Sequence, residues 1–137
     1  MKEQRTEQKR TAPYDLIERQ TVAFQRVKQN MISRIWHGWT TPANADVYET
    51  MLKEEIFVGI QNQHIRGFRS IQLLRREVGD EVEFVTMMVF DSLDAVREFA
   101  GEDYEAAVVH KKARAVLSRF DERSQHYEIR VERNAEG

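Results

Sequence analysis

The segment from Met31 to Trp39 carries the side chains best suited to chemistry. It holds Arg34, Trp36 and His37 in a run rich in β-branched and aromatic residues, which predicts a strand. Alternate residues of a strand share a face, so Arg34 and Trp36 lie on the same side. A flat substrate can stack on Trp36 while Arg34 stabilises an oxyanion. The structural alternative is that Trp36 fills a subunit interface and Arg34 pairs with an acid on a neighbouring strand.

Three further residues are candidates for the same site. His126 lies on the polar face of the predicted last strand, where a pKa near neutrality suits a general base. Its alternative role is a hydrogen bond at the rim of a subunit interface. His110 lies near a predicted break in a helix, at the mouth of a pocket or simply exposed at a helix end. Tyr104 can hydrogen-bond a ligand, or pack in the core with its hydroxyl at the surface.

Several kinds of site are excluded or disfavoured. There is no cysteine, which excludes disulfides and thiolate metal ligands. The four histidines have no spacing that places two of them on one helical face, so no metal site is predicted. No glycine-rich phosphate loop and no serine nucleophile motif occurs. We therefore expect no metal and no cofactor.

Composition indicates an ordinary globular domain. The 137 residues are 41% apolar and 32% charged, with a net charge of −2. This charge provides no basic field for nucleic acid or an anionic membrane. No run of about 18 apolar residues is present, and the N-terminal residues lack the apolar stretch of a secretion signal. The expected location is cytoplasmic.

Strands and helices alternate in the predicted order. The strands cover 31–39, 68–78, 81–90 and 123–132, and the helices cover 43–62, 93–100 and 103–118, the last broken near His110. Gly79-Asp80 forms a hairpin turn, and Asp91-Ser92 caps the second helix. This order predicts an α+β, ferredoxin-like β-α-β-β-α-β fold with an antiparallel four-stranded sheet and helices on one face.

The ends of the chain differ from this domain, which we place at 31–132. Residues 1–30 form an N-terminal extension of about +3 charge, with an expected disordered start. Helical spacing after Pro13 predicts a modest amphipathic helix over 14–28, with a flexible tail as the alternative. Residues 133–137 form a C-terminal tail.

The predicted central strands are apolar on both faces. In the third strand Phe84, Met88 and Phe90 oppose Val85 and its neighbours Met87 and Val89. A sheet this apolar cannot leave one side in water, and no further element is available to cover it. We therefore expect a homodimer in which two sheets close into a barrel.

Part of the sequence resembles a known family. The stretches Val82 to Thr86, Phe90 to Phe99 and Glu102 to Glu105, with Phe120-Asp121 before the last strand, resemble the antibiotic-biosynthesis monooxygenase family of the dimeric α/β-barrel superfamily. The resemblance covers the chain from Met31 to about Val131.

This resemblance implies a pocket between sheet and helices that suits a flat aromatic or similarly apolar molecule. The family includes cofactor-independent oxygenases of polycyclic phenols and haem-degrading enzymes. The haem-degrading branch uses an Asn on the first strand and a Trp and a His ten residues apart. In this chain the first strand contains no Asn, Phe99 stands at the Trp position, and Val109 stands at the His position. Haem degradation is therefore not expected.

Two functional hypotheses follow. The first is a cofactor-independent monooxygenase acting on a small flat apolar or phenolic molecule. Arg34 and His126 would be catalytic in it, and the substrate would contact Trp36, Phe90, Phe99, Tyr104 and His110. The second is a non-catalytic dimeric module that binds a small ligand or serves a stress response. The expected partners are a second copy of the chain and the small molecule.

Overall fold

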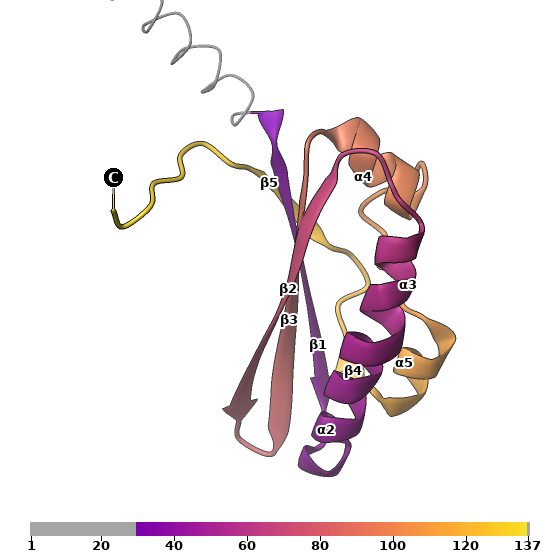
Figure 1. The fold of residues 1–137 in the computed structure, drawn as a ribbon. Coiled ribbons are helices and arrows are strands. Elements are labelled where there is room, and N and C mark those ends of the chain that lie inside the picture. The colour runs from indigo at the N-terminus through magenta and orange to yellow at the C-terminus, as the bar shows by residue number, and fades with distance from the viewer. Residues whose placement is uncertain (1–29, 137) are drawn as a thin grey trace, which may run out of the picture.

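The computed structural model describes residues 30–136, which form one antiparallel sheet with helices on a single face (Figure 1). The strands are β1 (Ile32–Thr40), β2 (Phe68–Val78), β3 (Glu81–Phe90), β4 (Arg119–Phe120) and β5 (Gln125–Glu128). Their order in the sheet is β2-β3-β1-β4, with β5 also pairing β1, as expected for a ferredoxin-like fold. The helices are α2 (Pro42–Met51), the π-helical turn η1 (Leu52–Ile56), α3 (Phe57–Asn62), α4 (Leu93–Ala100) and α5 (Lys111–Val116).

The central strands pair over their full length and fix which side chains face the helices. β1 and β3 run antiparallel from the pair Ile32–Phe90 to the pair Thr40–Val82. Opposite residues share a face, so Arg34, paired with Met88, lies on the helix side of the sheet.

The long helical segment begins and continues as its sequence predicts. The Thr41 hydroxyl accepts a hydrogen bond from the Asn44 N–H, and Pro42 occupies the first turn, where it needs no donor. The segment runs to Asn62 as one path through α2, η1 and α3. The π-helical turn in its middle was not predicted.

Two clusters of buried side chains fill the space between sheet and helices. One centres on Tyr48 and Phe84, whose rings meet edge-on at 4.8 Å. The other centres on Phe90 and Val96, both fully buried. Burial of these large apolar side chains stabilises the packing of the helices on the sheet.

The predicted third helix over 103–118 is largely wrong. Only Lys111–Val116 is helical, and the stretch from Asp103 to His110 is a loop. Its backbone pairs with the approach to β5: Ala107 donates to the Glu122 carbonyl, and Ser124 donates to the Glu105 carbonyl. Pairing with the neighbouring segment replaces the internal hydrogen bonds that a helix would have made.

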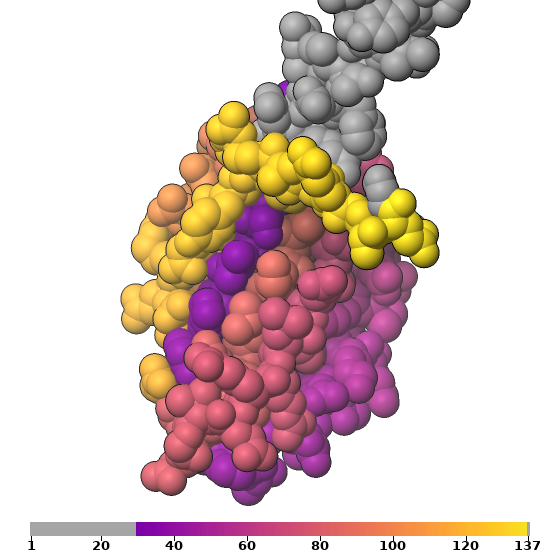
Figure 2. Space-filling view, turned by 90° about the vertical axis from the view of Figure 1, so that its left-hand side faces the viewer, coloured from indigo at the N-terminus to yellow at the C-terminus, as the bar shows by residue number. Residues whose placement is uncertain are grey.

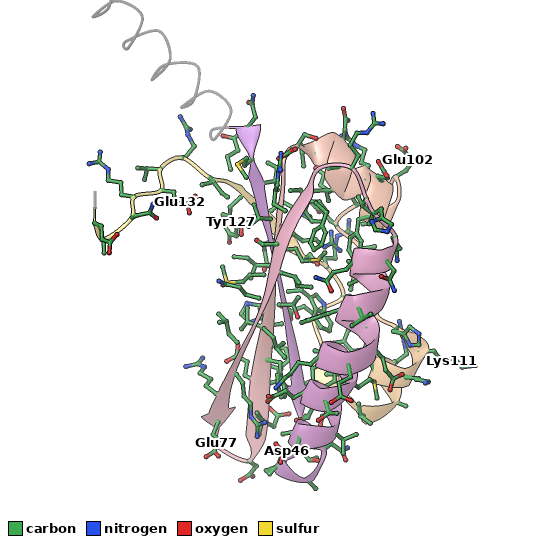
Figure 3. The ribbon with its side chains drawn as sticks, in the orientation of Figure 1. Asp46, Glu77, Glu102, Lys111, Tyr127 and Glu132 are labelled. Carbon is green, nitrogen blue, oxygen red and sulfur yellow. The ribbon has the colours of Figure 1, made fainter. Side chains whose placement is uncertain are left out.

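The last strand is shorter than the predicted 123–132, and its polar face is turned inward. His126 pairs with Arg34 of β1, so it faces the helices, while Tyr127 faces the other way and is 56% exposed. Tyr127 and Glu132 lie on the strand side of the molecule and Lys111 lies on the helix side (Figure 3).

Within residues 30–136, no helix covers the second face of the sheet (Figure 2). Ile35, Val85 and Met87 lie at its centre, and Leu74 of β2 is 46% exposed beside Val85. We call the set Ile35, His37, Trp39, Leu74, Val85, Met87 and Val89 the open face. Within it, His37 Nδ1 lies 2.8 Å from the Glu83 carboxylate, which also accepts from Arg76.

The predicted helix over 14–28 lies outside the described residues. Between residues 30 and 136, no helix has both the length and the apolar character needed to cross a membrane.

Candidate functional site

A cavity lies between the helix side of the sheet and the helices. It encloses about 540 Å³, including the space at its open mouth. The lining comes from all the layers: Arg34, Trp36, Tyr48, Leu52, Ile56, Phe57, Ile60, Ile71, Thr86, Met88, Phe99, Val108, Val109, His110, Ala113 and Ser124. An apolar cavity with a few polar groups is the usual form of a small-molecule site.

Arg34 is the charged centre of this cavity. Its side chain comes from the middle of β1, and the residue is only 3% exposed. The guanidinium donates to the carbonyls of Tyr104 and Ala106 and contacts His126, while its Cζ lies 5.5 Å from the centre of the Phe99 ring. Burial lowers the pKa of Arg34 to about 10, so it remains charged at neutral pH.

No carboxylate lines the cavity within residues 30–136. The hydrogen-bond partners of Arg34 are two neutral carbonyls and an imidazole. The alternative that Arg34 pairs with an acid on a neighbouring strand is therefore not observed among the described residues. A buried cation without an opposite charge is costly, and an anionic ligand would compensate it.

The contact with Arg34 determines the tautomer of His126. His126 Nε2 lies 2.9 Å from Arg34 Nη1, which can only donate, so Nε2 is the acceptor and the ring proton is on Nδ1. Burial, then the charge of Arg34, lowers the pKa of His126. The histidine is thus neutral with its basic nitrogen occupied, an arrangement that favours positioning Arg34 over accepting a substrate proton.

The loop that holds Arg34 is itself fixed to the sheet. Tyr104 and Ala106 supply the two carbonyls, and the backbone of Ala106 forms an antiparallel β-bridge with that of Arg123. The Tyr104 ring meets the His126 ring edge-on at 5.1 Å. Because the loop is bonded on both sides, its two carbonyls hold the guanidinium beside the cavity.

Ser124 and His110 add a hydroxyl group and an imidazole to the lining. Ser124 is 4% exposed, and its Oγ has no hydrogen-bond partner among the described residues. His110 lies at the N-terminal cap of α5, where its Nδ1 accepts from the Lys112 N–H. Neutral His110 therefore carries its proton on Nε2, and both groups can donate to a ligand.

Aromatic rings form the walls. The Trp36 indole donates to the Asp121 carbonyl at 2.6 Å, which holds its ring in place. Tyr48 is almost fully buried, and this burial raises the pKa of its phenol. With Phe99 over the guanidinium, these rings suit a flat apolar molecule.

The predicted site residues do not all reach the cavity. Arg34, Trp36, Phe99 and His110 line it. His126 lies behind Arg34 and outside the lining. Tyr104 contributes its carbonyl to Arg34 and also stands outside it. Phe90 is fully buried in a core cluster, where it contacts Phe99 at 5.8 Å between ring centres.

Sequence reasoning missed Ser124, Tyr48 and the π-helical turn. The position of Ser124 on the same strand face as His126 was a usable signal. Tyr48 lies within the predicted helix over 43–62, and nothing in its sequence context distinguishes it from a core residue. Leu52 and Ile56 of η1 line the cavity, in keeping with the frequent position of π-helical turns at functional sites.

Comparison with solved structures identifies the fold. A crystal structure described as a "putative" antibiotic biosynthesis monooxygenase from Bacillus cereus aligns with a TM-score of 0.54 at 14% identity, covering 77% of this chain and 99% of the other. Another structure of the same description, from Chloroflexus aurantiacus J-10-fl, has a TM-score of 0.47 at 18% identity and covers 78% and 99%. No family model matches the chain, and neither does any curated protein.

The chain therefore has the same fold as the Bacillus protein. At 14% identity this likeness extends to the architecture alone, since one fold hosts many activities.

Proposed function

We propose that this protein is a cofactor-independent monooxygenase that oxidises a small flat phenol in the cavity beside Arg34. The supporting observation is the buried guanidinium, which faces an apolar, aromatic cavity and has no carboxylate partner among the described residues. A phenolate would supply the missing negative charge, and its ring would pack between Trp36 and Phe99.

The proposed role of Arg34 is to favour the anion. A neighbouring cation stabilises the phenolate, so the pKa of the bound phenol falls and its proton leaves to solvent. The phenolate passes one electron to dioxygen, and the resulting radical and superoxide combine at the ring carbon para to the oxygen. The peroxide takes up a proton from solvent, and the hydrogen on that carbon then leaves with the terminal OH group as one water, which gives a quinone. One phenol and one dioxygen thus yield one quinone and one water.

The first experiment measures binding and turnover of α-naphthol by the full chain. Without oxygen, we expect the absorbance of bound naphtholate at a pH at which free naphthol is protonated. With oxygen, an electrode and chromatography should record equal amounts of dioxygen consumed and naphthoquinone formed. A wild-type protein that neither binds naphthol nor consumes oxygen with it would contradict the proposal.

Variants assign the effect to Arg34. Arg34→Ala should abolish naphtholate binding and turnover, because the compensating charge is gone. Arg66→Gln removes an exposed guanidinium and should leave both unchanged. Thermal unfolding of each variant separates loss of the site from loss of the fold, since Arg34 also holds the 103–110 loop.

The non-catalytic binding module is the second candidate. It is favoured by the hydrogen bonds to the acceptor nitrogens of His110, which lines the cavity, and of His126 behind Arg34, so that among the described residues neither the lining nor the group behind Arg34 offers a free imidazole base. Binding of naphtholate without oxygen consumption would support this candidate over the monooxygenase.

We also propose that the working unit is a homodimer formed through the open face. The apolar side chains there, over which no helix of residues 30–136 lies, support a second copy as the cover.

A further inference from the structure

Arg34 has more hydrogen-bond donors than its protein partners use. A guanidinium has five N–H groups. Three are used, by the Tyr104 carbonyl, the Ala106 carbonyl and His126 Nε2. Within residues 30–136, no hydrogen bond uses the N–H of Nε or the second N–H of Nη2.

The positions of the used donors indicate where the unused ones point. The two carbonyls are two residues apart in one loop and accept from the two different terminal nitrogens, so the loop caps the end of the guanidinium. The remaining Nη2–H then runs parallel to Nε–H along the side edge. Two parallel donors on one edge match a pair of oxygens, as in a carboxylate, better than a single oxygen.

Ser124 adds a second, independent sign of a polar ligand. Its hydroxyl is buried in the cavity lining and has no partner among the described residues. A buried hydroxyl without a hydrogen bond is destabilising, so a ligand oxygen that it contacts would gain affinity. Arg34 and Ser124 both line the same cavity.

We propose that the ligand presents two neighbouring oxygens that share one negative charge, with a phenol carrying an ortho carbonyl group as the substrate class. The choice of a phenol rests on the proposed function above. In the free molecule the phenolic proton lies between the two oxygens. In the site the O–H bond breaks, the proton leaves to solvent, and the two parallel N–H groups of Arg34 take its place.

Two isomeric probes test this recognition. The acetyl oxygen of ortho-acetyl-α-naphthol adjoins the phenolic oxygen, whereas that of para-acetyl-α-naphthol is on the far side of the ring. Titration without oxygen gives a Kd for each, expressed per anion from the pKa of each free probe. We expect the ortho isomer to bind at least about tenfold more tightly, the effect of one added hydrogen bond to a charged group. Equal affinities, or a preference for the para isomer, would overturn the inference.

Variants locate the discrimination. Arg34→Lys keeps the charge but loses the paired donors, so the ratio of the two Kd values should fall close to one. Ser124→Ala should weaken both probes or the ortho isomer alone, and unchanged binding of both would remove Ser124 from the site. If Arg34→Lys does not fold, the wild-type ratio still decides the matter.

Failure of this inference is distinguishable from failure of the proposed function. Ortho preference without oxygen consumption would leave the recognition intact and overturn the monooxygenase. Oxidation of α-naphthol without ortho preference would do the reverse. Tight binding of naphthoate, with weak binding of both acetylnaphthols, would assign the paired donors to a carboxylate and overturn the phenol class.

Discussion

His126 titrates next to a permanent cation, and this makes it sensitive to acid. Its Nε2 accepts a hydrogen bond from Arg34. Protonation of Nε2 would remove this hydrogen bond and place two buried positive N–H donors in contact. Burial and the charge of Arg34 lower its pKa below the ordinary value of 6.5, against a smaller opposite effect of Glu105. The interaction therefore depends on the neutral form.

The first prediction concerns stability against pH. The unfolded chain binds a proton at His126 before the folded protein does, so the free energy of unfolding should fall as the pH drops from about 6.5 through the lower pKa of the folded state. His126→Gln keeps an acceptor for Arg34 but does not titrate, so it should flatten this part of the curve. Chemical denaturation at several pH values measures both proteins.

Acidic side chains provide the control for this curve. Glu83, hydrogen-bonded by His37 and then Arg76, has a pKa below its ordinary 4.5. Its stabilisation is lost only at more acidic pH, so wild type and His126→Gln should decline together there. Parallel curves between pH 6.5 and 4.5 would show that His126 does not titrate as described.

Helix α3 contains a glycine, Gly59, at a position where another residue would fit without backbone strain or steric clash. Gly59 is exposed in the helix, and a Cβ placed there meets nothing within 4 Å. Gly59→Ala should raise the free energy of unfolding by about 0.5 to 1 kcal/mol, because alanine loses less backbone entropy in a helix. Denaturant unfolding measures the change.

Gly67 is the matched control at a different backbone conformation. Its φ is +87°, and a Cβ there would lie 2.8 Å from the Cβ of Ala95. Gly67→Ala should therefore destabilise the protein. If Gly59→Ala were also destabilising, α3 would have to pack against something that the described residues do not include.

The elements that local chemistry determines could be predicted from sequence. The hairpin strands 68–78 and 81–90 have the predicted bounds, because Gly79 (φ +60°) and Asp80 form the turn between alternating apolar segments. Alternation also placed Arg34 and Trp36 on one face, and both line the cavity.

The remaining elements depend on contacts between distant segments. The spacing of Ala106, Val109, Ala113 and Val116 fits a helix, but the backbone near Ala106 pairs with Arg123 and serves Arg34 instead. The three hydrogen bonds that orient Arg34 involve two backbone carbonyls and a residue 92 positions away. No sequence pattern encodes such a set, and the π-helical turn over Leu52–Ile56 left no signal either.

The whole molecule has two unlike sides. Helices and the cavity occupy one side of the sheet, and the open face occupies the other (Figures 1 and 2). Along the open face, Trp39 lies between Arg119, whose Cζ is 3.9 Å from the indole centre, and His37. This band of aromatic and charged groups borders the apolar centre around Ile35 and Met87, an arrangement typical of subunit interfaces.

The last prediction tests the dimer. Met87→Lys places a charge at the centre of the open face, where a second sheet would leave it desolvated and unpaired. We expect light scattering to report twice the chain mass for wild type and a single chain mass for Met87→Lys, with circular dichroism unchanged.

Val58→Lys adds the same charge at an exposed position of α3 and should remain dimeric. A folded wild-type monomer in dilute buffer, or a Met87→Lys protein that still dimerises, would show that the open face is not the interface. Because the cavity opens on the opposite side of the sheet, a monomeric Met87→Lys should still bind α-naphthol if it keeps its fold.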